Sequence, residues 1–434
     1  RIRVPVATRN ALLSGPEEIH LRSIATSVLF LMMAGSVGVP AAETSDPDTA
    51  SEEQERPSVL QQMAEAAIIA GVVVDPTSPG KLSDVRAASG SLAEDDGEAR
   101  NGNFVVAPIP ISTSTIGSGL AAIALYVFRP FESDTISPPT TIGVGGLYTD
   151  NDSWAAAFGG KTYLHEDRWR LTGVYGRFDF NYPFFGTGND AGEEGRSIRL
   201  DQLGDAGMVE VLRKVAGRWY AGLRYTVLET TIVPDLAPDF DLPPGLEDLL
   251  RLDTTIAAVG VRVQYDSRDD VFAPRTGTYF DVQGSFARES VGSDWEYESY
   301  NAAWNGYWNP RARDVVAARA FACGAADAPF FDLCQFGSGA DLRGYTGGRY
   351  RDEAMIALQT EYRYWFRRRW AATAFVGVGE VAPSFGEIRG DNLLPAGGVG
   401  LRWRASKTQR IGLRVDYAWG KNDQAFYVSV GEAF

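Results

Sequence analysis

The stretch Arg410-Ile-Gly-Leu-Arg-Val-Asp-Tyr-Ala-Trp-Gly420 decides the fold of this chain. In a β-strand, successive side chains point to opposite faces, so a period of two separates its residues into two sets. One set is Ile411, Leu413, Val415, Tyr417 and Trp419, and the other is Arg410, Gly412, Arg414 and Asp416. The stretch therefore predicts a strand with one apolar face and one charged face.

The neighbouring segments repeat this alternation. The preceding one sets Val399, Leu401 and Trp403 against Gly400, Arg402 and Arg404, and the final one sets Phe426, Val428, Val430 and Phe434 against Tyr427, Ser429 and Gly431. A water-soluble sandwich would also alternate, but here the charges gather on one side and the other side is rich in aromatic residues. Because an Arg that faces lipid at mid-bilayer costs roughly 2–4 kcal/mol, we expect the charged side to face the lumen of a membrane-spanning barrel.

From Phe104 onward, about sixteen segments have strand character, and bacterial single-chain barrels have even strand numbers. The strands are predicted to begin near Phe104, Leu120, Thr141, Ser153, Arg168, Ser197, Trp219, Thr254, Thr276, Asp294, Asp314, Ala354, Trp370, Leu394, Arg410 and Gln424. Long connections at 183–196, 233–252, 327–351 and 383–392 alternate with short ones at 165–167, 217–218, 309–313, 367–369 and 406–409. Long loops outside and short turns inside are typical of outer-membrane barrels. The sequence thus predicts an all-β fold, a single transmembrane antiparallel β-barrel over residues 104–434.

The N-terminal region has the pattern of an export signal. An apolar stretch over residues 24–39 is followed by small residues, which predicts a signal peptide over residues 1–42 that is cleaved near Ala41 or Ala42. A retained membrane anchor is the alternative interpretation. Residues 1–19 do not suit the start of a signal peptide and indicate an over-extended reading frame.

Residues 43–103 are acidic and rich in Ser, Asp, Pro and Ala. Such a composition predicts a mostly disordered periplasmic segment, with a short helix at Val59–Ile69 in its one apolar stretch. The helix would either brace the barrel or be part of a linker.

The formal net charge of the chain is −15, with 41 Lys and Arg against 56 Asp and Glu. Nucleic-acid binding normally needs a basic patch, so we expect no nucleic-acid partner. The only two cysteines, Cys323 and Cys334, lie near the start of one long loop. An exported protein meets an oxidising compartment, and the spacing fits either a local disulfide or two unpaired thiols.

A turn motif stands between the eighth and ninth predicted strands. It begins with Tyr265-Asp266-Ser267-Arg268-Asp269 and continues with Pro274, Gly277 and Tyr279. Asp side chains can cap backbone amides and Arg268 can bridge carboxylates, while Pro274 and Gly277 set the bend. The motif predicts a hairpin that is tied by several hydrogen bonds.

The loop at 327–351 contains Leu342-Arg343-Gly344-Tyr345. This motif, the hairpin motif, the final strand ending on Phe434 and the position of the loop after the eleventh strand together resemble the BamA/TamA family of outer-membrane assembly barrels. The family is also called the bacterial surface antigen family, and the resemblance covers roughly residues 104–434.

In that family the loop folds back into the lumen, where its Arg meets an acidic residue on the next strand and another one strand later. The resemblance implies that Arg343 pairs with Glu361, which shares an inward face with Gln359 and Arg363. The alternative is that Arg343 is an ordinary exposed loop arginine.

The chain departs from the family pattern at the second acid. The pattern Phe-x-Asp-x-Gly is here Phe375-Val-Gly-Val-Gly379, so Gly377 stands where Asp is expected. Glu380 follows closely, but it would face inward only if the apolar Val376 and Val378 did so too. We therefore expect one carboxylate fewer to hold the loop.

Assembly barrels of this family also carry periplasmic POTRA domains of about 75 residues, a size typical of a small domain. Residues 43–103 are too few and too disordered for one. The chain resembles the short branch of the family that lacks such domains, and this difference weakens the expectation that it handles client proteins.

The first predicted strand holds Pro108 and Pro110, which donate no ladder hydrogen bonds and are tolerated at sheet edges. Each lost bond forgoes about 0.5–1.5 kcal/mol, so we expect weak closure against the last strand, which ends near Phe434. In the resembled family this seam is the lateral gate through which clients meet lipid. A proline-containing lead-in before a shorter first strand is the alternative.

Three functional classes compete for such a barrel: an insertase or translocation pore, a passive barrel acting as surface antigen, porin or scaffold, and a barrel enzyme. The enzyme class has little support, because His20 and His165 are the only histidines and no Gly-x-Ser-x-Gly motif is present. We expect no enzymatic activity, no metal and no cofactor.

The resemblance favours a protein of the bacterial outer membrane that assists insertion or translocation of proteins or lipids. Its expected partners are outer-membrane lipids, client outer-membrane proteins or lipids, and a periplasmic protein.

Overall fold

The computed structural model describes residues 102–434, except 114–115, 132, 135, 236–249, 271–272, 338–340 and 405–411. The predicted signal peptide, the helix at Val59–Ile69, nearly all of the acidic segment and the turn at 406–409 lie outside these residues. The described part of the chain contains no α-helix with the length and hydropathy of a transmembrane span.

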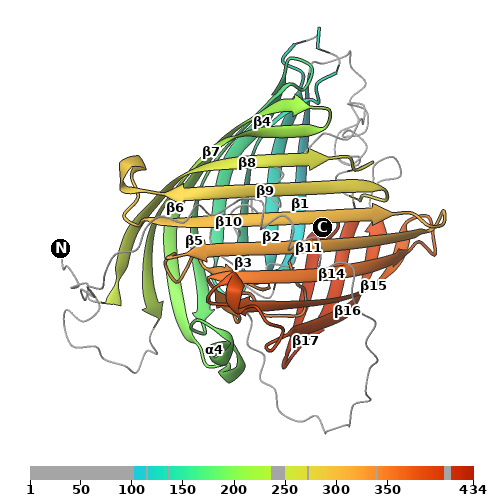
Figure 1. The fold of residues 1–434 in the computed structure, drawn as a ribbon. Coiled ribbons are helices and arrows are strands. Elements are labelled where there is room, and N and C mark those ends of the chain that lie inside the picture. The colour runs from blue at the N-terminus through green and yellow to red at the C-terminus, as the bar shows by residue number, and fades with distance from the viewer. Residues whose placement is uncertain are drawn as a thin grey trace, which may run out of the picture. The chain divides into compact units, whose positions relative to one another are not determined.

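Sixteen strands of the described chain close into one antiparallel barrel (Figure 1). They are β1 (Gly102–Thr113), β2 (Gly117–Phe128), β3 (Thr140–Thr149), β4 (Trp154–Leu164), β5 (Trp169–Phe184), β6 (Ile198–Ala216), β7 (Trp219–Asp235), β8 (Leu252–Asp266), β9 (Gly277–Ala287), β10 (Tyr297–Trp308), β11 (Asp314–Ala326), β14 (Ala354–Tyr364), β15 (Trp370–Ala382), β16 (Leu394–Arg404), β17 (Gly412–Gly420) and β18 (Asp423–Val430). Each pairs with the next barrel strand along the chain, and β18 returns to β1. The predicted all-β barrel is confirmed, and every strand begins within three residues of its predicted start.

Few other elements accompany the barrel in the described residues. A short helix, α4 (Asn189–Glu194), and two 3-10 turns, η1 (Glu289–Val291) and η2 (Phe385–Glu387), lie in connections between strands. Two short strands, β12 (Cys334–Gln335) and β13 (Arg351–Asp352), form a separate sheet within the long connection between β11 and β14.

The alternation that predicted the barrel sets the two faces of its wall. On β14, Leu358 and Tyr362 are exposed, whereas Gln359, Glu361 and Arg363 between and beside them are buried. Lipid-facing and lumen-facing side chains thus alternate along the strand, as a period of two requires.

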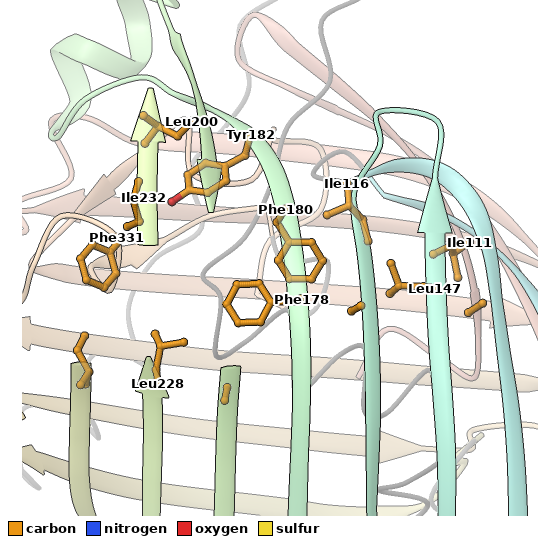
Figure 2. Close-up of a cluster of buried hydrophobic side chains, with 14 of the residues drawn as sticks. Ile111, Ile116, Leu147, Phe178, Phe180, Tyr182, Leu200, Leu228, Ile232 and Phe331 are labelled. Atoms are coloured by element: carbon orange, nitrogen blue, oxygen red, sulfur yellow. The ribbon is translucent and has the colours of Figure 1, made fainter. Parts of the chain in front are cut away.

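One half of the lumen departs from the expected rule of apolar residues outside and charges inside. Figure 2 shows buried apolar side chains on the inner wall of the N-terminal strands. Phe178 and Phe180 of β5 are 0% exposed and stack with ring centroids 5.0 Å apart. Loop residues Phe330 and Phe331 pack against this wall. Apolar residues are favourable on this part of the inner wall because the loop covers it and keeps water away.

The joint between β1 and β18 is short. Among the described residues these strands share one register pair, Ser112 opposite Val428, whereas β1 pairs with β2 at twelve positions. Pro108 and Pro110 lie within β1, with both side chains exposed.

The prediction that Phe434 continues the apolar face of the last strand is wrong. The strand ends at Val430, and the chain turns at Gly431, whose φ is 86°. Glu432 then pairs with Arg402 at 2.6 Å inside the lumen, and the Phe434 ring lies 6.0 Å from Cζ of the buried Arg343. A charged partner within the barrel therefore outweighs continued strand pairing at this end.

Candidate functional site: a buried arginine in the barrel lumen

The site is built by the connection between β11 and β14, residues 327–353, which we call the lumen loop. The loop is tied at its start, because Cys334 of β12 forms a disulfide with Cys323 of β11. Its own small sheet pairs Cys334 with Asp352 and Gln335 with Arg351. The described middle of the loop is buried, including the motif Leu342-Arg343-Gly344-Tyr345.

Arg343 is 0% exposed and is surrounded by polar partners. Its Nη2 lies 2.6 Å from Glu361 Oε2, and its Nη1 lies 2.6 Å from Asp416 Oδ2. Nε donates a hydrogen bond of 3.0 Å to Gln359 Oε1. The guanidinium also lies over the Phe375 ring, 3.5 Å from its centroid. A buried guanidinium is tolerated only when it is paired in this way, since the loss of hydration costs several kcal/mol.

The two carboxylates are shared with other arginines of the wall. Glu361 also contacts Arg363 and Arg402, and Asp416 also contacts Arg402. Arg402 and Arg363 in turn reach Glu432, at 2.6 Å and 3.4 Å. The resulting arginine–carboxylate network consists of Arg343, Glu361, Arg363, Arg402, Asp416 and Glu432.

This network overturns the expectation that the loop lacks a second carboxylate. Asp416, on β17, supplies it, although Gly377 of β15 stands where Asp was expected. A Cβ on Gly377 would lie 2.6 Å from Cδ1 of Leu342 and 2.8 Å from the Leu358 carbonyl oxygen. Leu342 therefore occupies the space above Gly377. Glu380 does not reach Arg343 and instead accepts a hydrogen bond from Gly390 N.

The residues after Arg343 hydrogen-bond the loop to β16, to β18 and to the turn between β17 and β18. Gly344 has a φ of 107°, and its N–H donates to Tyr427 Oη at 3.1 Å. Tyr345 Oη donates to the Pro395 carbonyl at 2.5 Å and accepts from Lys421 N at 2.9 Å. Burial raises the pKa of Tyr345, so the phenol stays protonated and can make both bonds.

The hairpin motif lies in the turn between β8 and β9. Arg268 forms a two-point ion pair with Asp266, at 3.0 and 2.7 Å, and lies over the Tyr279 ring, 4.4 Å from its centroid. Asp269 accepts from the amides of Arg275 and Thr276, at 2.8 and 3.0 Å.

Backbone contacts complete this turn and link it to the network. Gly277 has a φ of 107° and leaves no room for a Cβ beside the Ser267 carbonyl. Arg363 Nη1 lies 3.4 Å from the carbonyl oxygen of Pro274, so the turn contacts the arginine–carboxylate network.

Sequence reasoning missed the roles of Asp416, Arg402 and Glu432. The first two lie on faces that the alternation identified as charged, so a signal for their inward direction was present. The pairing of Asp416 with Arg343, 73 residues earlier in the chain, was not readable, and neither were the ion pairs of Arg402 with Glu361 and Glu432, because these contacts depend on strand register and on the fold of the loop. Glu432 follows the break at Gly431, which the pattern did not indicate.

No group of three or more His, Cys, Asp or Glu side chains that could hold a metal occurs in the described part of the chain. His165 lies in the short turn between β4 and β5, with a φ of 56°. His20 lies outside the described residues.

Comparisons with known proteins place this geometry in a family. The family model described as "Omp85 superfamily domain" matches residues 140–434 of this chain. A search of the curated proteins finds no significant match.

Among solved structures, BamA from Haemophilus ducreyi lacking POTRA domains 1–3 is similar, with a TM-score of 0.54 and 16% identity over 77% of this chain and 70% of that chain. CdiB from Acinetobacter baumannii gives a TM-score of 0.49 and 14% identity over 76% and 60% of the two chains. CdiB from Escherichia coli gives 0.49 and 10% over 77% and 63%. With a matched region that spans most of its barrel, this chain belongs to the Omp85 superfamily of bacterial outer-membrane β-barrels.

Proposed function

We propose that this protein assists the insertion or translocation of proteins or lipids at the outer membrane, through the seam between β1 and β18. Members of the Omp85 superfamily are transport and insertion barrels without enzymatic activity. The proposal extends that general role to this chain and assigns it to one joint of the wall.

The short pairing at the seam is the observation that carries the proposal. Adjacent strands elsewhere in the described barrel pair over many residues, such as β17 and β18 with eight register pairs. Within the described part of the chain, β1 and β18 share the single pair Ser112–Val428, and the prolines of β1 cannot donate to a neighbour. Because each ladder hydrogen bond contributes about 0.5–1.5 kcal/mol net, this joint is expected to open at the lowest cost.

The arginine–carboxylate network also supports opening at the joint between β1 and β18. Through Glu361 and Asp416, Arg343 connects the lumen loop to β14 and β17, and Gly344 connects it to β18 through Tyr427. These contacts hold the C-terminal strands together as one body. We infer that opening therefore occurs between this body and β1.

A disulfide across the seam tests the proposal. Ser112 and Val428 are directly opposite, and Cα atoms of such pairs lie about 4.5–5.5 Å apart, within the range that a disulfide accepts. The double variant S112C/V428C, reconstituted in liposomes, is expected to accelerate insertion of an unfolded eight-stranded outer-membrane barrel when reduced. Oxidation is expected to abolish this acceleration, measured by heat-modifiable gel mobility of the client.

The control is A372C/L401C on β15 and β16, another directly opposed pair, whose side chains are exposed. Its activity is expected to be the same whether reduced or oxidised. Equal activity of the oxidised and reduced seam variant would contradict gating at this joint. Absence of any acceleration by the wild-type protein would indicate a passive barrel.

A further inference from the structure

A basic cleft opens at the end of the barrel where the short turns lie. It has a volume of about 430 Å3 and lies between the β8–β9, β10–β11 and β14–β15 turns and the end of β16. Its lining residues are Arg275, Ala312, Arg313, Trp365, Phe366, Arg367, Arg368 and Arg404. Five of these eight residues are arginines in a chain whose net charge is −15. A volume of this size is ordinary for a small-ligand site.

The positive charge of this cleft is not balanced by the residues that line it, since none of them is acidic. Arg313, Arg367 and Arg368 are exposed, and no ion pair joins them to a carboxylate within the described residues. Arg275 donates to the Ala312 carbonyl through Nη2, while its Nε is buried without a hydrogen-bond partner in the described chain. The exposed guanidinium groups of Arg313, Arg367 and Arg368 are clustered without a neighbouring carboxylate, and such a cluster suits an external anion.

The surroundings of the cleft place it at the membrane surface. Phe366 lines the cleft and is 41% exposed, and Trp308 and Trp370 at nearby strand ends are 49% and 38% exposed. Exposed aromatic residues at the ends of barrel strands form the girdle that sits at headgroup level. The exposed turn residues Arg313, Arg367 and Arg368 therefore lie at the depth of lipid phosphates, at the end of the barrel with the short turns, which we assign to the periplasm.

We propose that this cleft binds the headgroup of an anionic phospholipid in the periplasmic leaflet of the outer membrane. Arginine recognises phosphate by paired N–H donors, and Phe366 offers an apolar contact for the adjoining glycerol and acyl region. Basic residues near a membrane surface attract anionic lipids, and a site at this rim would keep such lipid next to the C-terminal half of the wall.

A second cleft of similar chemistry supports a lipid as the occupant. It is lined by Arg168, Trp169, Arg213 and Lys214, among others, at the β4–β5 and β6–β7 turns of the same rim. Arg213 lies over the Trp169 ring, 5.3 Å from its centroid. Basic groups beside tryptophan thus recur around the rim, as contact with a continuous layer of headgroups would require.

Lipid retention by the full-length protein tests the proposal. Native mass spectrometry after titration with phosphatidylglycerol or phosphatidylcholine would measure how many lipids stay bound. We expect the wild-type protein to retain phosphatidylglycerol at roughly ten-fold lower lipid concentration, and R313Q/R367Q/R368Q to lose this preference. The variant R313K/R367K/R368K, which keeps the charge, is expected to retain part of it.

The control R177Q/R196Q/R199Q removes the same charge from exposed arginines toward the opposite end of the barrel and is expected to behave like wild type. Equal phosphatidylglycerol retention by R313Q/R367Q/R368Q and wild type would overturn the proposal. Equal retention of phosphatidylglycerol and phosphatidylcholine by the wild-type protein would also overturn it. That result is expected if an acidic protein segment, and not a lipid, occupies the cleft. Complete displacement of the lipid by millimolar inorganic phosphate would assign the cleft to a soluble anion and would equally overturn it.

Discussion

At Arg343, one guanidinium without contact to water is balanced by two carboxylates, one amide oxygen and one aromatic face. Such a group contributes to the stability of the fold mainly because separating it from its partners costs free energy. Removing one member of a buried ion pair leaves an uncompensated charge and typically costs about 3–5 kcal/mol. Asp416 and Glu361 both lie 2.6 Å from Arg343, so we expect the loss of either carboxylate to destabilise the fold.

Replacing Asp416 by Asn is therefore expected to lower the free energy of unfolding by about 3–5 kcal/mol. Urea titration in detergent micelles, followed by heat-modifiable gel mobility, would measure the change. The exposed Asp253, which pairs with Arg251 at 2.9 Å, is a suitable control, and D253N should change stability by less than about 1 kcal/mol. Equal effects of the two substitutions would contradict a role for Asp416 in holding Arg343.

Gly344 is predicted to tolerate no side chain. Its φ of 107° is unfavourable for other residues, and a Cβ would lie 2.7 Å from the Trp419 carbonyl oxygen. We expect G344A to destabilise the lumen loop by about 1–3 kcal/mol and to increase its cleavage by added protease. Gly390 has a φ of 81° but open space around its Cβ, so G390A carries the backbone strain without the contact and should have the smaller effect.

At the scale of elements, the lumen loop joins the two unlike halves of the barrel interior. Its first part presents Phe330 and Phe331 to the apolar wall, where the Phe330 ring lies 5.0 Å from that of Phe184 on β5. Its second part presents Arg343 to the charged strands β14 and β17. The loop therefore matches each half chemically, and the disulfide at its start limits the conformations that it can adopt when undocked.

The docking of the first part is expected to depend on pH through Asp332, a loop residue outside the membrane-spanning strands. Burial raises the pKa of Asp332 to about 6, and Tyr297 Oη donates to its Oδ2 at 2.5 Å. A carboxyl whose pKa is higher in the folded state favours folding while protonated, and this contribution is lost as pH rises through about 6.

We thus expect the lumen loop to be held more tightly at pH 5 than at pH 7.5, by about 1–3 kcal/mol. Hydrogen exchange of peptides from residues 327–337 would report this difference. D332N should remove most of it, because an amide does not titrate. Slower exchange at pH 7.5 than at pH 5, after correction for the intrinsic rate, would contradict the assignment.

At the scale of the whole barrel, pairing between strands is uneven around the wall. β6 pairs along its length with both β5 and β7, whereas β1 is paired along its length on one side only. The C-terminal residues turn into the lumen at Gly431 and do not lengthen the joint with β1. One joint is consequently short while the remaining ladder is continuous.

This difference predicts that backbone amides in β1 exchange with solvent faster than those in β6. Local opening needs fewer bonds to break at β1, so we expect at least about 100-fold less protection there. Hydrogen exchange with mass spectrometry on the reconstituted protein would measure both strands in one experiment. Locking the seam through oxidised S112C/V428C should raise the protection of β1 and leave β6 unchanged.

Much of this architecture was readable from the chain, since a period of two and the placement of turns specify strands directly. Five strands begin at the residue that the sequence predicted, namely Trp219, Asp314, Ala354, Trp370 and Leu394. The inward direction of Arg414 and Asp416 also follows from alternation alone, because adjacent residues must face opposite sides. The partner of Arg343 on β14 could be named only through resemblance to a family.

Tertiary structure alone decided what the lumen contains. The exchange of a β15 carboxylate for Asp416 of β17 depends on strand register and on Leu342 filling the space over Gly377. The apolar inner wall around Phe178 requires the loop that packs against it, and the inward turn of Phe434 requires Arg402 and Arg363 as partners for Glu432. Local pattern determines which way a side chain points, whereas closure of the barrel determines which distant side chains it meets.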